Sequence, residues 1–109
     1  NRISWLQSLD EQGLAFPVID PLVVAPEYAP VIEDELLGPL DDPSEEDLLF
    51  LLAMTIPSDM TKVTANMKAP FIINAVARKG VQLIVENEDY PVKFNVYESV
   101  KKMKEKAGE

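Results

Sequence analysis

Hydrophobic and polar positions alternate weakly in the first twenty residues and predict two short strands. The first covers residues 5–9, and the second covers residues 14–20 after a turn. Pro17 has no backbone N–H to donate, so we expect it on an edge strand or at a bulge. Because a residue before proline favours extended geometry, Asp20-Pro21 ends the second strand.

The central part of the chain is broken by prolines. Residues 26–43 form a long acidic connection, with a short helical turn expected at residues 32–37. A loop of this length in a small domain is usually functional or mobile.

The next segment, residues 43–56, is ambiguous. Ser44 followed by three acidic residues is typical of a helix start. The apolar run from Leu48 to Met54 fits a buried helix or a buried strand, because periodicity alone cannot separate the two. On composition we favour a helix slightly, ended by Pro57.

β-branched residues in segments 71–76 and 81–86 predict a hairpin with a turn that contains Gly80. An edge strand and a basic helix with an apolar side follow. The expected strands cover residues 62–67, 71–76, 81–86 and 90–97, and the helix covers residues 98–106.

Charge is unevenly distributed along the 109 residues. Residues 1–61 contain 13 acidic residues and one basic residue, whereas residues 62–109 contain nine basic and six acidic residues. The two parts carry net charges of −12 and +3, and the whole chain −9. This charge argues against binding nucleic acid or an anionic membrane, so neither is expected as a partner. The acids form either a solvated face or a patch that steers a basic partner.

Several chemistries are excluded by composition. The chain has no Cys and no His, which excludes disulfides, thiol catalysis, cysteine or histidine metal ligands and a histidine base. Neighbouring carboxylates in proline-rich loops are typical of solvated acids, so we expect no catalytic residue, cofactor or metal site. The apolar-flanked aromatics Trp5, Phe16, Phe71 and Tyr90 are expected in the core.

The segment from Thr64 to Pro70 places Asn66 between two apolar stretches. Asparagine side chains bind nearby backbone groups and shape tight connections. The segment is therefore interpreted either as a structural corner between strands or as a partner-binding loop.

Five segments carry a characteristic order of residues. They are residues 5–9 with Trp5, residues 16–21 with Phe16, Asp20 and Pro21, residues 64–74 with Ala65, Ala69, Pro70 and Asn74, residues 80–84 with Gly80, and Tyr90-Pro91. In this order, over residues 5–97, the chain resembles the FliW family of flagellar assembly factors.

The resemblance implies a mainly β fold: a small antiparallel β-barrel-like domain with short helical turns and a short C-terminal helix. It makes residues 44–47 a helical turn and residues 48–56 a buried strand. It divides the chain into a β domain at residues 1–97 and a basic helix or tail at residues 98–109. Family members begin well before a segment like residues 5–9, so N-terminal strands are expected to be missing. Exposed strand edges would then favour an edge-paired or entwined homodimer.

The resemblance also implies a non-enzymatic cytoplasmic regulator that binds flagellin and sequesters the translational repressor CsrA, relieving repression of flagellin synthesis. CsrA binds RNA and needs a basic surface, which suits an acidic partner. The residues expected to contact partners are Glu33, Asp34, Glu35, Asp41, Asp42 and Asn66. A generic acidic interaction domain, a nucleic-acid mimic and a small carboxylate-dependent hydrolase are the alternatives.

Overall fold

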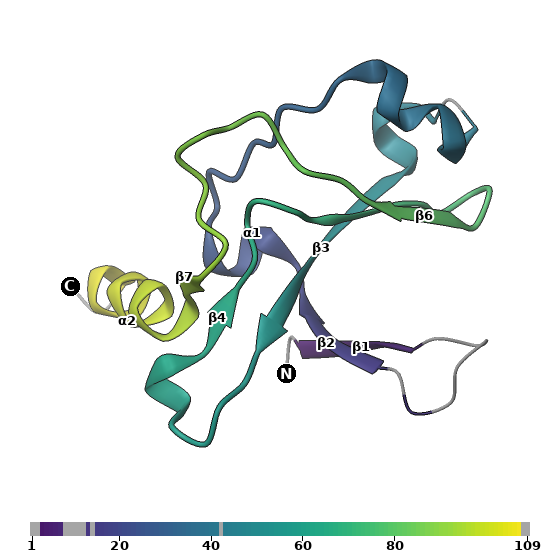
Figure 1. Cartoon of the computed structure of the whole chain (residues 1–109). Helices are drawn as coiled ribbons and strands as arrows, with labels where there is room; N and C mark the ends of the chain where they lie inside the picture. The colour runs from purple at the N-terminus through teal and green to yellow at the C-terminus, as the bar shows by residue number, and fades with distance from the viewer. Residues whose placement is uncertain (1–2, 8–12, 14, 42, 108–109) are drawn as a thin grey trace.

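The computed structural model describes residues 3–7, 13, 15–41 and 43–107, and shows a twisted antiparallel sheet with a C-terminal helix at one side (Figure 1). The strands are β1 (Ile3–Gln7), β2 (Ala15–Ile19), β3 (Leu48–Thr55), β4 (Thr64–Ala65), β5 (Phe71–Asn74), β6 (Lys79–Gln82) and β7 (Phe94–Asn95). The helices are α1 (Pro21–Val24), the 3-10 turns η1 (Asp34–Leu40), η2 (Glu45–Asp47) and η3 (Met60–Lys62), and α2 (Val96–Ala107).

Strand β3 is the centre of the sheet. It pairs antiparallel with β2 and β4 near its end and with β5 near its start. The path β1-β2-β3-β4-β7 therefore carries a branch from β3 through β5 to β6. Within the described residues, β1, β6 and β7 each pair with one neighbour, so the strands do not close on themselves. The mainly β prediction is confirmed, and "barrel-like" holds only loosely.

The ambiguous central segment is a strand. The helix favoured on composition is wrong, whereas the short turn followed by a strand, implied by the resemblance, is confirmed by η2 and β3, although β3 is buried only at Leu52 and Met54. Leu52 is fully buried and Met54 nearly so, while Leu49 on the opposite face is 44% exposed. Pairing with three strands overrides the helix preference of leucine because tertiary burial outweighs local propensity.

The main core lies on one face of the sheet. Helix α2 contributes Val96 to this core and packs Val100 against it, and α1 contributes Val24. The other members are Ile19, Tyr28, Leu52, Met54, Val63, Ala65 and Met67.

The prediction that Trp5 and Phe16 are core residues is wrong. Trp5 is 66% exposed and Phe16 is 40% exposed. In the described chain β1 is an edge strand that pairs with β2 alone. Trp5 therefore pairs with Pro17 of β2, and no described strand pairs with β1 on its other side. Phe16 packs its ring on Phe71, with centroids 6.1 Å apart, and stays partly open to solvent. Phe71 and Tyr90 are half-buried.

Several element boundaries differ from the sequence-based expectations. Gly80 lies in strand β6 and not in the turn, whose left-handed residue is Arg78 with a φ of 59°. The edge strand expected at residues 90–97 is only β7, and the helix expected at residues 98–106 begins earlier, at Val96. Helix α1 was not expected. Asp20 caps it by accepting a hydrogen bond from the Leu22 N–H at 2.9 Å.

Pro17 was expected on an edge strand or at a bulge, but β2 lies between β1 and β3 and Pro17 pairs with Trp5 in unbroken register. Strand β2 pairs with β1 along its whole length, but with β3 only through Val18 and Ile19. Pro17 therefore lies outside the ladder between β2 and β3, where proline is tolerated because only one neighbouring strand pairs with it.

Candidate partner-binding surface

Most of the predicted contact residues lie on one connection. We call residues 27–47, which run from the end of α1 to the start of β3, the acidic arm. Glu33, Asp34 and Glu35 follow one another at the start of η1, and all three side chains are exposed. Two apolar side chains beside them are also exposed, Val31 by 53% and Leu36 by 41%. The arm thus presents carboxylates and apolar groups together.

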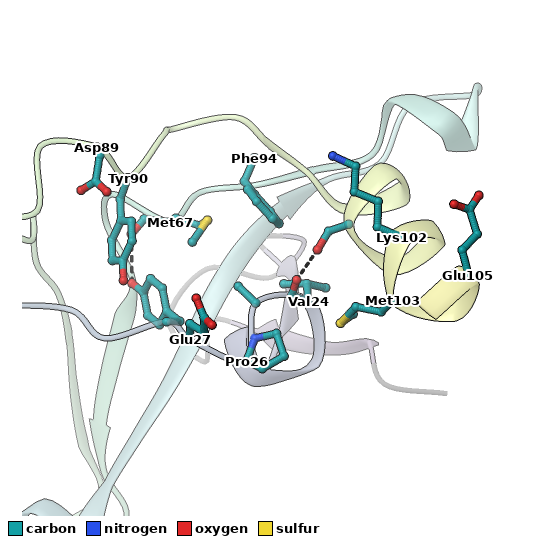
Figure 2. Close-up of a pocket in the computed structure, with 13 residues that line it drawn as sticks. Val24, Pro26, Glu27, Met67, Asp89, Tyr90, Phe94, Lys102, Met103 and Glu105 are labelled. Atoms are coloured by element: carbon teal, nitrogen blue, oxygen red, sulfur yellow. Dashed lines mark hydrogen bonds between the residues drawn. The ribbon is translucent and has the colours of Figure 1, made fainter. Parts of the chain in front are cut away.

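Tyr28 anchors the first end of the acidic arm. Its ring stacks on Tyr90 with centroids 5.0 Å apart, and its hydroxyl donates to the Met67 carbonyl at 2.9 Å (Figure 2). Burial, and secondarily the neighbouring Tyr90, raises the pKa of Tyr28 far above its ordinary value. The phenol therefore remains a neutral donor.

Asn87 extends this anchor. Its side-chain oxygen accepts from the Val31 N–H at 2.7 Å, and its side-chain nitrogen donates to the Ala29 carbonyl at 3.1 Å. The Ala29 N–H donates to the Tyr90 hydroxyl at 2.8 Å, and the Glu86 N–H donates to the Val31 carbonyl at 2.8 Å. Residues 29–31 are thereby fastened to the segment before β7, although they form no strand.

Asn74 anchors the second end of the arm. This side chain is 4% exposed, and its nitrogen donates to the Leu40 carbonyl at 2.7 Å. The next residue, Asp41, has a left-handed φ of 62° and pairs with Lys79 at 3.0 Å. Both members of that pair are more than half exposed, so the pair contributes little free energy. The exposed acids at residues 33–35 are thus held between two fixed points.

Asn66 closes a structural corner. Its side-chain oxygen accepts from the Lys68 N–H at 3.0 Å and from the Ala69 N–H at 3.1 Å, and its own N–H donates to the Ala53 carbonyl. The neighbouring Ala65 and Pro70 are buried, and the Pro91 carbonyl accepts from Met67. These bonds support the corner interpretation of this segment.

The structure places Asn66 at the opposite end of β3 from Asp41 of the arm. Asn66 bonds Ala53 near the end of β3, whereas Asn74, which holds Leu40 of the arm, pairs with Leu48 at the start of β3. Five residues of strand separate these points, which is roughly 17 Å. Asp42 lies outside the described residues.

A cavity of about 760 Å³ lies between the beginning of the arm and α2 (Figure 2). Met67, Tyr90 and Phe94 line one side of it, and Lys102 and Met103 line the other. The first anchor of the arm therefore forms one wall of this cavity.

Three residues important to this surface were missed from sequence, namely Tyr28, Asn87 and Lys79. The contacting residues are 38 apart in sequence for Asp41–Lys79, 39 apart for Tyr28–Met67 and 58 apart for Asn87–Ala29. No local pattern could have indicated these contacts.

The described residues do not gather acidic groups into a metal site. No group of three or more such side chains among them is arranged to hold a metal ion. No helix in the described part of the chain is long and apolar enough to cross a membrane. Exposed carboxylates beside apolar side chains suit contact with a protein surface that is basic and partly apolar.

Known proteins resemble this chain over most of its length. A family profile described as "FliW protein" matches residues 1–96. The flagellar assembly factor FliW of Lachnoclostridium phytofermentans is 56% identical over 96 residues, covering 88% of this chain and 62% of the relative. The flagellar assembly factor FliW of Lachnospira eligens is 46% identical over 101 residues, covering 92% of this chain and 67% of the relative.

The fold agrees with this resemblance. A crystal structure of the flagellar assembly factor FliW superposes with a TM-score of 0.83 at 30% identity, covering 88% of this chain and 68% of the other. The chain spans 62 to 67% of the length of these two curated relatives. The segment order noted in the sequence, the match over residues 1–96 and the shared fold together show that this chain belongs to the FliW family.

Proposed function

We propose that this chain acts in flagellar assembly as a cytoplasmic, non-enzymatic protein that binds flagellin and sequesters CsrA, so that repression of flagellin synthesis is relieved. Family membership supports the flagellar role. The anchored acidic arm supports the contact with CsrA, because an RNA-binding repressor carries a basic surface. The exposed carboxylates of Glu33, Asp34 and Glu35 are the observation that carries this proposal.

The two anchors matter to the proposal. A long flexible loop would lose conformational entropy on binding, about 1 to 2 kcal/mol for each residue that becomes fixed. Hydrogen bonds donated by Tyr28, Asn87 and Asn74 hold both ends of the arm in the free protein. The carboxylates are therefore already positioned in the free protein. Most of the conformational entropy of the arm is lost on folding, and little remains to be lost on binding.

The test measures the association rate of purified CsrA with a variant that combines Glu33→Gln, Asp34→Asn and Glu35→Gln. We expect the rate at low salt to fall about tenfold and its salt dependence to become shallower, because exposed charges steer encounter. The matched control neutralises Glu88, Glu98 and Glu105, which are exposed outside the arm. Both variants carry the same net charge, so a global charge effect would slow them equally and would contradict a role for the arm.

Binding itself is tested by calorimetry of the wild-type chain against CsrA and against flagellin in separate titrations. Heat with CsrA and with flagellin supports the proposal, and no heat with either would overturn it. An Asn66→Ala variant that keeps its melting temperature but loses binding would move Asn66 from the structural corner to the contact surface.

A further inference from the structure

A groove with a basic rim lies on a different part of the molecule from the acidic arm. It has a volume of about 370 Å³ and is bordered by β1, β3, η3 and α2. Its floor contains the buried core residues Ile19, Met54 and Val63. Lys101 and Lys104 of α2 border it.

Two large apolar side chains at the groove are exposed to solvent. Met60 of η3 is 56% exposed and Tyr97 of α2 is 41% exposed. Exposed apolar groups over a buried apolar floor mark a surface suited to contact with another molecule. The apolar part of this groove would therefore favour an apolar side chain from a partner.

Helix α2 forms one wall of the groove and carries a basic row of one tyrosine and two lysines. Tyr97, Lys101 and Lys104 are spaced four and three residues apart, so they lie on one side of α2. Another side of the helix packs inward, where the Ser99 hydroxyl donates to the Val24 carbonyl and the Val96 N–H donates to the Val63 carbonyl. These bonds hold the basic row at the edge of the groove.

The opposite wall is also held in place. Asp59 accepts hydrogen bonds from the Thr61 hydroxyl at 2.6 Å and the Thr61 N–H at 3.0 Å, at the start of η3. The same bonds lower the pKa of the Asp59 carboxyl, so it caps the turn as an anion. Met60, the first residue of η3, is thereby fixed beside the groove.

We propose that this groove is a docking site for an amphipathic segment of a partner protein that carries apolar residues and at least two acidic residues. Both lysines are exposed, and within the described part of the chain neither forms an ion pair. In a chain with a net charge of −9, this local positive rim selects an occupant of opposite charge to the one that suits the acidic arm. The inference goes beyond the proposed contact with CsrA and uses a separate surface.

The experiment uses the whole chain and two synthetic 14-residue peptides. The first is an amphipathic helix with leucines at positions i, i+3, i+4 and i+7 and glutamates on its flanks. The second replaces every glutamate by lysine. Binding is measured by fluorescence polarisation, and the contact surface is mapped by methyl and amide NMR shifts.

We expect the glutamate peptide to bind and to shift the signals of Met60, Val63 and Val100. The double variant Lys101→Glu/Lys104→Glu should weaken binding of the glutamate peptide about tenfold, because two exposed charge contacts change from attractive to repulsive. The matched control Lys93→Glu/Lys102→Glu makes the same change of net charge outside the groove, since Lys102 lines the cavity of Figure 2. It should change the affinity less than twofold by the same reasoning.

A second variant tests the apolar part of the site. Met60→Ala removes an exposed side chain, so the fold should persist, and we expect roughly a threefold loss of affinity for the glutamate peptide. Equal binding of both peptides, shifts confined to other surfaces, or equal losses in the two charge variants would each overturn the proposal. Self-association of the chain that Lys101→Glu/Lys104→Glu abolishes would also overturn it, in favour of a second copy as occupant.

Discussion

Replacing Asn74 by alanine should destabilise the protein more than the same replacement at Asn66. The two side chains close the same kind of turn, because each oxygen accepts from the N–H groups two and three residues later. The bond lengths are 3.0 and 3.1 Å in both cases. Asn74 also donates to the Leu40 carbonyl at 2.7 Å, across 34 residues of sequence. The difference between the two variants therefore reports on the second anchor of the acidic arm.

The magnitude follows from burial. Asn74 is 4% exposed and Leu40 is 1% exposed, so water reaches the abandoned Leu40 carbonyl poorly. A buried group left without its partner costs about 1 to 3 kcal/mol. Asn66 is only half-buried, and we expect Asn66→Ala to cost about 1 to 2 kcal/mol and Asn74→Ala about 2 to 4 kcal/mol. The total free energy of unfolding of a domain of this size is about 5 to 15 kcal/mol.

The assays are urea and thermal unfolding of both variants, followed by amide hydrogen exchange. Asn74→Ala should lower the melting temperature by about 4 to 8 °C for each kcal/mol lost and should speed exchange in residues 33–41. Asn74→Asp keeps the acceptor but places a carboxylate against the Leu40 carbonyl, so it should not restore stability at pH 7. Costs for the two alanine variants that agree within about 0.5 kcal/mol would refute the reasoning.

Three further predictions concern other positions. The buried Tyr28 keeps its proton when the unfolded chain begins to lose it near pH 10, so stability should fall by about 1.4 kcal/mol per pH unit above pH 10. Urea unfolding of Tyr28→Phe should show a shallower slope there, and an unchanged slope would contradict the assignment. Asp20→Ala should cost about 1 kcal/mol in the same assay by uncapping α1, and Asp20→Asn should recover most of it. Arg78→Gly should raise the free energy of unfolding by up to about 1 kcal/mol, because glycine relieves the positive φ, and a lower melting temperature would disprove this.

Much of the fold could be predicted from local signals. The β-branched runs around the turn at residues 75–78 indicated the β5–β6 hairpin, and Asp20-Pro21 correctly marked the end of β2. These features are local because turn geometry and extended backbone depend on residues that are neighbours in sequence. The sequence alone also determined where the acidic charge is concentrated.

Only the tertiary structure decided which elements meet. Leucine-rich residues 48–55 became a strand because three other strands pair with them, and Trp5 lies open to solvent because β1 pairs with β2 alone among the described strands. The anchors of the acidic arm join Tyr28 to Met67 and Asn74 to Leu40 over 39 and 34 residues of sequence. Composition determined that the arm is acidic, but only contacts between distant residues decide that its ends are fixed and its carboxylates exposed, because such contacts leave no periodic trace in the sequence.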